Sequence, residues 1–211
     1  GWTRGTIPGD AVLAVGKSGS VASNPIIGTA YSGNSTFGSG TPCGGGSAVF
    51  NSSGTSVSVI NLIAETQYYF NAYEYFSATN CYAIPALTGN RYTLSVEPTS
   101  QPTSGLSATT CATNSIDLTV PAPSAGADGY IVLQKSGSAP TGLPADAIAY
   151  AVGNTIGDAT VAAIVTSSGT ITISGLSAST NYYFLLIPYN ANSALVAQTY
   201  NYLTSGTLLQ T

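Results

Sequence analysis

Histidine and methionine are absent from this 211-residue chain, and only 6% of its residues carry a charge. Without histidine, the chain lacks the most common general base and the most common protein ligand for metals. Four lysines and arginines cannot build a basic patch against phosphates, so nucleic-acid binding is not expected. No apolar run comes near the roughly 18 residues that would predict a membrane span.

Cysteine is scarce as well. The three cysteines, Cys43, Cys81 and Cys111, are too few for a disulfide scaffold, and their spacing matches no zinc site. Because even an initiator methionine is missing, we expect a processed product or a segment of a longer chain, with any export signal already removed. The 44% apolar content, with a net charge of only −4, predicts a folded chain rather than a disordered one.

An internal repeat is the strongest signal in the sequence. Residues 10–20 match residues 128–138 at a separation of 118 (128 − 10), and residues 57–70 match residues 171–184 at 114 (171 − 57). Small loop insertions and deletions account for the drift. The chain is therefore predicted to be a tandem repeat with about 100 residues per unit.

Both repeats have the composition of β-strands, and no segment has a helical period flanked by caps. Each half contains a short apolar run, a run that alternates at period two and an aromatic run. In the first half they lie at residues 12–15, 57–60 and 67–75, and in the second at residues 130–133, 171–174 and 181–189. Clusters of Gly, Asn, Ser and Pro separate them. This pattern predicts an all-β protein of two β-sandwiches.

The domain boundary is predicted in residues 97–104, where two prolines and four hydroxyl residues form a short, semi-rigid, extended connector. The predicted domains are residues 1–97 and 98–211.

These residues resemble the fibronectin type III family of immunoglobulin-like sandwiches. The resemblance covers nearly the whole chain and rests on a motif that both halves carry, Leu62-x-x-x-Thr66-x-Tyr68 and Leu176-x-x-x-Thr180-x-Tyr182. Within this family, the chain is most similar to tandem repeats of large secreted surface proteins of Bacteroidetes-type bacteria. Such modules serve mostly as spacers, adhesive units or accessory domains, so the resemblance is informative about fold and weak about activity.

The resemblance also implies that the first domain is incomplete. At the offset of 118, Trp2 falls on Val120 and corresponds to the family's core tryptophan of strand B. Strand A and most of strand B are therefore expected to be absent from the first domain. The last strand of the second domain is expected to be short.

No catalytic, cofactor-binding or metal-binding residue is predicted. The eight carboxylates are Asp10, Glu65, Glu74, Glu97, Asp117, Asp128, Asp146 and Asp158. Asp10 and Asp128 occupy equivalent turns, where capping explains them, and no acidic pair suited to glycoside hydrolysis is evident. No Asp-x-Asp-x-Asp calcium loop occurs, and no serine or cysteine has a histidine to activate it.

Tyrosine is abundant, with 14 residues. Exposed tyrosines among Asn, Ser and Thr can stack on sugars or pack in protein contacts. Candidate glycan contacts are Tyr73, Tyr75 and Tyr189. The alternative interpretation is that they are ordinary residues of the sheets.

The topology of the family implies a disulfide between Cys43 and Cys81, because the loops that carry them would emerge at one pole of the first sandwich. Closing that loop would stabilise the fold by about 3–4 kcal/mol in the chain-entropy model. Cys111 is left without an intrachain partner.

The leading hypothesis is a non-enzymatic, extracellular structural protein, a segment of a bacterial surface stalk, fibre or adhesin, with self-association or neighbouring repeats as partners. The alternative is a spacer or carbohydrate-binding module of a secreted polysaccharide-degrading enzyme, with surface glycans as partners. For assembly, the open edge near Trp2 could receive residues 204–211, which carry Leu208 and Leu209. Simple end-to-end stacking, and an excerpt that does not assemble, remain as alternatives.

Overall fold

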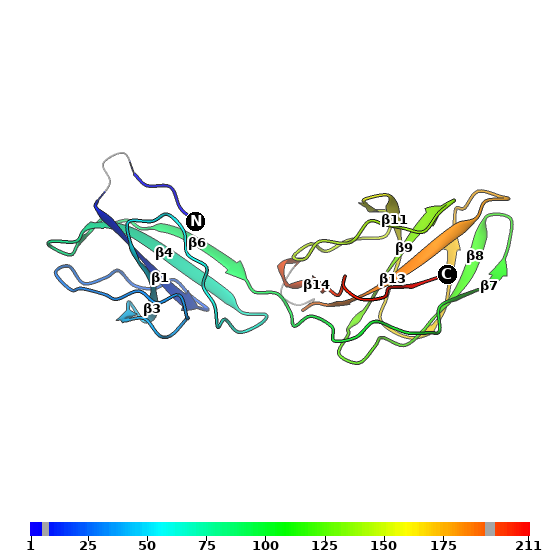
Figure 1. Ribbon diagram of the computed structural model, residues 1–211, viewed down its shortest axis with the longest axis horizontal. Coiled ribbons are helices and arrows are strands. Elements are labelled where there is room, and N and C mark those ends of the chain that lie inside the picture. The colour runs from blue at the N-terminus through cyan, green and yellow to red at the C-terminus, as the bar shows by residue number, and fades with distance from the viewer. Residues whose placement is uncertain (6–8, 193–196) are drawn as a thin grey trace. The chain divides into compact units, whose positions relative to one another are not determined.

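The computed structural model describes residues 1–5, 9–192 and 197–211. The chain forms two compact units, unit 1 (Gly1–Thr93) and unit 2 (Leu94–Thr211), and the boundary predicted after residue 97 falls just inside unit 2 (Figure 1). Regular structure is almost entirely β, and the only helix among the described residues is the 3-10 turn Ala197–Thr199. The predicted all-β fold with two tandem units is confirmed.

Unit 1 is a single antiparallel sheet. Its strands are β1 (Ala11–Ser18), β2 (Pro42–Cys43), β3 (Gly46–Ser52), β4 (Gln67–Phe76), β5 (Cys81–Tyr82) and β6 (Leu87–Tyr92). The order is β2-β3-β1-β4-β5, and β6 also pairs with β4. Gly44 and Gly45 have positive φ angles of 58° and 78°, as the tight turn joining β2 to β3 requires.

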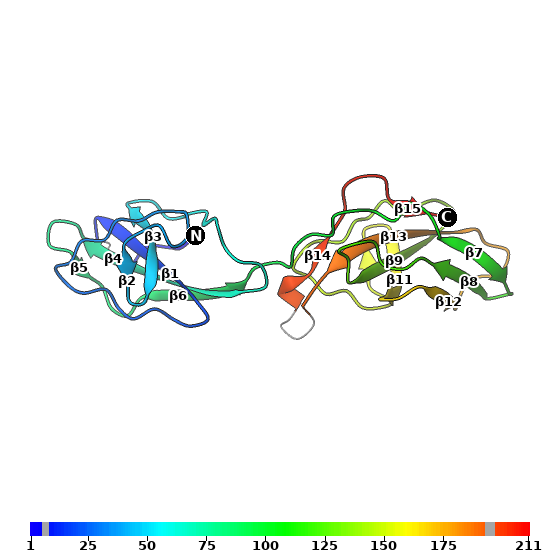
Figure 2. The ribbon, with the colours of Figure 1, turned by 90° about the horizontal axis from the view of Figure 1, so that it is seen from below.

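Unit 2 has two sheets. The larger contains β9 (Gly129–Ser136), β10 (Thr155–Ile156), β11 (Ala159–Val165), β13 (Tyr182–Asn190), β14 (Asn201–Tyr202) and β15 (Leu209–Gln210). The smaller contains β7 (Ser107–Cys111), β8 (Ser115–Val120) and β12 (Gly169–Ser174). Figure 2 shows these three strands grouped apart from β9, β11 and β13. Unit 2 is therefore a β-sandwich of two facing sheets.

The repeat seen in the sequence extends to irregularities of the backbone. Pairing of β1 with β3 shifts register between Ala14 and Val15, and pairing of β9 with β11 shifts between Val161 and Ala163. A β-bulge at the same place in both units shows that the large sheets are copies of one another.

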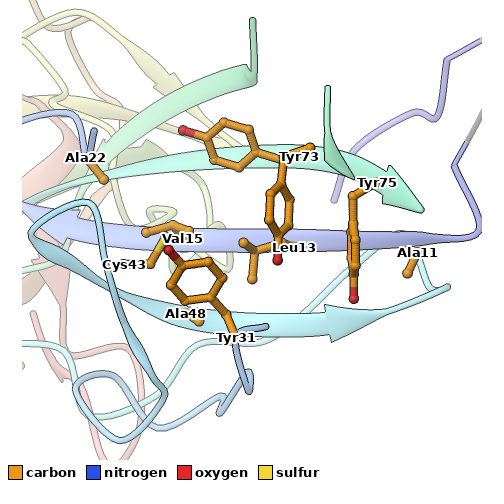
Figure 3. Packing of buried hydrophobic residues seen from close by; sticks show 10 residues of the cluster. Ala11, Leu13, Val15, Ala22, Tyr31, Cys43, Ala48, Tyr73 and Tyr75 are labelled. Atoms are coloured by element: carbon orange, nitrogen blue, oxygen red, sulfur yellow. The ribbon is translucent and has the colours of Figure 1, made fainter. Parts of the chain in front are cut away.

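One face of each large sheet carries an equivalent core. In unit 1 this core includes Leu13, Val15, Tyr31 and Tyr73, whose side chains gather against the sheet in Figure 3. In unit 2 the corresponding core is built from Ile131, Leu133, Ile187 and their neighbours. Unit 2 has a further core between its two sheets, which includes Leu118, Tyr130, Phe184 and Leu186, and the described residues of unit 1 form no such second core.

The strand predicted at residues 57–60 is wrong, although the strand predicted at 171–174 is confirmed as part of β12. The two segments differ because only the segment in unit 2 has a neighbouring strand among the described residues. β12 pairs only with β8, over six residue pairs, and the described part of unit 1 has no counterpart of β8. Apart from Ile60, which forms an isolated bridge with Thr36, the segment has no partner among the described residues to satisfy its backbone groups, so it does not form a strand.

The residues just ahead of the predicted connector, and Gln101 within it, are hydrogen-bonded to the rest of unit 2. The backbone N–H of Ser95 donates to the carbonyl of Thr199 at 2.8 Å, and Asn190 Nδ2 donates to the carbonyl of Val96 at 2.8 Å. Gln101 Nε2 donates to the carbonyl of Leu203 at 2.7 Å. These bonds place the connector among the structural elements of unit 2.

Candidate functional site

The carboxylates at equivalent turns cap those turns, as predicted. Asp10 accepts hydrogen bonds from the backbone N–H and the hydroxyl of Ser77, at 2.7 and 2.6 Å, and these bonds hold the pKa of Asp10 below its ordinary value. Asp128 accepts the backbone N–H of Ala191 at 2.9 Å. Both carboxylates tie the start of a central strand to the turn that follows its neighbour.

Asp158 organises a loop of unit 2. Lys135 Nζ donates to it at 2.7 Å, and the backbone amides of Thr141 and Gly142 donate at 2.9 and 2.8 Å. Lys135 first, and then these amides, lower the pKa of Asp158. A carboxylate held charged by three neighbours anchors the loop; it is poorly suited to carry a proton in catalysis.

The described residues contain no group of three or more His, Cys, Asp or Glu side chains that could hold a metal ion. Among the same residues, no helix has the length and apolarity needed to cross a membrane.

Tyrosines form the same buried cluster in both units. Tyr31 and Tyr82 pack edge to face with ring centroids 6.0 Å apart, and Tyr150 and Tyr202 do so at 5.9 Å. The hydroxyl of Tyr82 donates to the carbonyl of Thr29 at 2.8 Å. The corresponding bond in unit 2, from Tyr202 to the carbonyl of Ile148, is 2.9 Å long. The clusters pin the long loops that follow β1 and β9 onto the sheets.

A second repeated tyrosine fixes the turn before the long strand. The hydroxyl of Tyr68 accepts the backbone N–H of Ile63 at 3.1 Å, and that of Tyr182 accepts the N–H of Ser177 at 3.0 Å. This arrangement is the tyrosine corner of immunoglobulin-like sandwiches. It explains why both halves carry a tyrosine at the end of the shared motif.

The three candidate glycan-contact tyrosines are buried. Tyr73, Tyr75 and Tyr189 are 0%, 5% and 6% exposed. Burial also raises the pKa of Tyr73 and of Tyr189. This placement removes them as sugar platforms, because a ring must present a face to solvent in order to stack on a sugar.

The cysteines are all free thiols, which corrects the predicted disulfide between Cys43 and Cys81. Cys43 is in β2 and Cys81 in β5, at opposite ends of the strand order, with β3, β1 and β4 between them. Tyr82 points into the core that contains Cys43, so Cys81, its neighbour in the strand, points to the other face. Cys43 is buried and Cys81 and Cys111 are exposed.

The second face of the unit 1 sheet opens onto a groove of about 520 Å³. We call it the open groove and define it by its main apolar lining, Trp2, Val49, Val57, Val59, Leu62 and Phe70. Its position corresponds to the core between the two sheets of unit 2. Phe184 is 1% exposed in that core, whereas its counterpart Phe70 is only partly buried.

Two alanines lie at the bottom of the open groove, and their small side chains leave space above the sheet. Ala14 and Ala72 are cross-strand partners in β1 and β4 and both line the groove. The corresponding pair in unit 2 is Val132 and Leu186, which fill the space between its sheets. The groove therefore reflects two features: the described residues of unit 1 form no second sheet, and the side chains beneath the groove are smaller.

Trp2 enters the open groove at one end. Its ring packs edge to face on Phe50 with centroids 5.0 Å apart, and its backbone N–H donates to the carbonyl of Thr55 at 2.9 Å. The indole Nε1 is buried and has no hydrogen-bond partner among the described residues.

The two leucines predicted to take part in assembly are partly buried and pack against the cores of unit 2. Leu209 pairs with Leu186 across β15 and β13 and packs against the core between the sheets, while Leu208 packs against the outer core. The C-terminal segment would therefore have to leave its own unit before it could be donated to another chain.

The groove residues Val57, Val59, Leu62 and Phe70 were not among the predicted site residues. The signal that could have found them was present: these positions match core positions of the second repeat, and the resemblance had already implied that strand B was missing above them. The paired tyrosine clusters were equally visible, because Tyr31, Tyr75 and Tyr82 recur as Tyr150, Tyr189 and Tyr202.

No family model matches the chain, and no curated protein matches its sequence. Among solved structures, it is similar to a two-domain fibronectin type III segment of chicken tenascin, with 14% identity and a TM-score of 0.31. That match covers 100% of this chain and 89% of the tenascin segment.

Proposed function

We propose that the chain is a non-catalytic pair of fibronectin type III-like modules with a structural role in a secreted or surface-exposed bacterial protein, such as a stalk, fibre or adhesin. The proposal rests on the role of the polar side chains, which hold the fold together. The carboxylates Asp10, Asp128 and Asp158 and the buried tyrosines all hold loops and turns in place.

The small number of charged side chains and ion pairs supports the same role. Only two ion pairs link described side chains, Arg4 with Glu74 at 3.6 Å and Lys135 with Asp158 at 2.7 Å. Surface ion pairs are weakened by salt, so a fold with few of them depends little on ionic strength. Such independence suits an extracellular module whose surroundings vary.

The alternative of a carbohydrate-binding module loses its candidate residues, because Tyr73, Tyr75 and Tyr189 are buried. We therefore favour the structural role, with neighbouring repeats or further copies of the protein as partners.

Light scattering and electron microscopy of the purified chain over a range of concentrations test the proposal. Concentration-dependent, end-to-end association supports the stalk or fibre role, and a glycan array should show no binding. A hydrolytic activity on polysaccharides, or saturable binding to a defined glycan, would contradict it.

A further inference from the structure

Unit 1 carries a lysine at the position where unit 2 uses a lysine to hold a carboxylate. Lys17 in β1 and Lys135 in β9 are equivalent at the repeat offset of 118 (135 − 17). Lys135 Nζ donates to the carboxylate of Asp158 at 2.7 Å. Asp158 is the second residue of the two-residue turn between β10 and β11, and Gly45 is the second residue of the turn between β2 and β3. Unit 1 therefore has the lysine of this pair without its carboxylate.

The Lys17 ammonium nevertheless lies where such a carboxylate would be. A methyl group added at Gly45 would be 3.5 Å from Lys17 Nζ. The two ion pairs among the described side chains use Arg4 and Lys135, and no described residue forms a hydrogen bond with the Lys17 side chain. Lys17 is partly buried. Because partial burial of a charge is less costly beside an opposite charge, this position favours an anion.

The loop that follows β1 is anchored without help from Lys17. In unit 2, the backbone amides of Thr141 and Gly142 donate to the carboxylate of Asp158 and fasten the loop that follows β9. In unit 1, the backbone N–H of Ser23 donates instead to the carbonyl of Gly44 at 2.9 Å. A backbone hydrogen bond thus takes the place of the carboxylate as the anchor.

A cavity of about 270 Å³ lies beside Lys17. It is lined by Phe37, Pro42 and glycines of the glycine-rich stretch 38–46. Gly45 helps to keep it open, since only Lys17 comes within 4 Å of the methyl group that another residue would place there. The cavity therefore combines an ammonium with apolar side chains, which suits a carboxylate carried on a short apolar body.

We propose that this cavity, which we call the Lys17 site, binds a carboxylate from outside the unit, the group that Asp158 supplies internally in unit 2. A small organic acid and an acidic side chain of a second copy of the chain share this chemistry. With a net charge of −4, the chain as a whole does not attract anions, so the attraction is local to Lys17. The inference goes beyond the proposed structural role and does not rest on it.

Benzoate is the probe, and benzamide, which has nearly the same shape and no charge, is its control. Titration of the full chain with benzoate at low ionic strength should shift the NMR signals of the Lys17 side chain and of the Gly45 amide saturably. Benzamide should not. Lys135 is an internal control that should not respond, because Asp158 already occupies its ammonium. Raising the ionic strength from about 0.01 M to about 0.2 M should weaken benzoate binding several-fold.

Two substitutions separate a site from general electrostatics. Lys17→Gln removes the ammonium and should abolish the response to benzoate. Arg91→Gln is the matched control, because Arg91 is an exposed cation of the same unit that does not line the cavity, and it should leave the response intact. A response that persists in Lys17→Gln, or that is lost equally in Arg91→Gln, would overturn the proposal.

Gly45→Asp tests the geometry without an added ligand. The new carboxylate would lie beside Lys17, and Gly45→Asn is the matched control because both variants adopt the same positive φ, 78° in the present fold. The aspartate variant should no longer bind benzoate. Relative to the asparagine variant, its unfolding equilibrium constant should be about two- to fivefold lower with Lys17 than in a Lys17→Gln background. No such difference, together with benzoate binding that survives Gly45→Asp, would overturn the proposal.

Dilution identifies the source of the carboxylate. Signals of Lys17 and Gly45 that shift with protein concentration, and that benzoate returns to their dilute positions, would assign the ligand to a second copy. Signals that respond to benzoate and not to concentration would assign it to a small organic acid. Both results support the Lys17 site. Failure of the site leaves the structural role standing, whereas a glycan-array signal that persists in Lys17→Gln would contradict the structural role alone.

Discussion

Units 1 and 2 share one sheet and differ in the other. The sheet β2-β3-β1-β4-β5 and the sheet β10-β11-β9-β13-β14 have the same strand order, the same bulge and the same tyrosine cluster. Unit 2 adds β7, β8 and β12, and with them a second core. Among the described residues, the outer core and its pinned loops of unit 1 form without a second sheet. The alternating segment, residues 57–60 in unit 1 and β12 in unit 2, is a strand only in unit 2, where β8 lies beside it.

The largest expected difference between the units is in hydrogen exchange. Alternate amides of β12 are bonded to β8, whereas residues 56–59 have no backbone partner among the described residues. We expect the bonded amides of β12 to exchange at least about 100-fold more slowly than those of residues 56–59. Exchange measured by NMR on the full chain tests this. Equal protection would mean that residues 56–59 are paired in solution.

Equivalent phenylalanines should differ in their contribution to stability. Phe184 is fully enclosed between two sheets, and Phe70 lines the open groove. Phe184→Ala should lower the free energy of unfolding of unit 2 by about 3–5 kcal/mol. Phe70→Ala should cost unit 1 about 1–2 kcal/mol, since less apolar area is lost from burial. Denaturant titration that resolves both units is the measurement. Similar losses would show that the groove is filled in solution.

Alkaline pH should destabilise both units, because both bury tyrosines. Burial, the largest cause, raises the pKa of Tyr82 to about 12, and it also raises that of Tyr202. The native state then keeps these phenols neutral where an unfolded chain, with a pKa near 10, ionises them. The stabilisation from Tyr82 is complete below about pH 10 and is lost as the pH rises through about 12, and that from Tyr202 is also lost at alkaline pH. Tyrosinate absorbance should therefore rise together with loss of the fold, not before it.

Removing one hydroxyl from each tyrosine cluster should cost the two units the same. Tyr82→Phe leaves the carbonyl of Thr29 without this donor, and Tyr202→Phe does so for Ile148. Each substitution should lower the free energy of unfolding by about 1 kcal/mol. The two losses should agree within the error of the measurement. A clearly larger loss in unit 2 would indicate that its second sheet stabilises the outer core as well.

The smallest expected effect is the contribution of Asp158 to the acid response of unit 2. The pKa of Asp158 is below its ordinary value of 3.8 in the fold, so its stabilisation is present above that pH and is lost as the pH falls further. Asp158→Asn should reduce the decrease in Tm of unit 2 below about pH 4. Unit 1 serves as the internal control, because Gly45 stands at the corresponding position near Lys17 and the acid response of unit 1, to which Asp10 contributes, should not change in the variant. If the Tm of unit 2 decreases at acid pH by the same amount in the variant, this role of Asp158 is contradicted.

The sequence by itself determined the all-β class, the tandem repeat and the central strands, because apolar alternation and aromatic runs are local patterns that repeat between the halves. It also determined the capping role of Asp10 and Asp128. Tertiary structure decided three other features. Cys43 and Cys81 stay apart because strand order and side-chain alternation place them on different faces. Tyr73, Tyr75 and Tyr189 are buried because long loops fold back over the sheets. Residues 57–60 form no strand beyond the isolated bridge at Ile60, because a β-strand needs a neighbour along its length and only the fold supplies one.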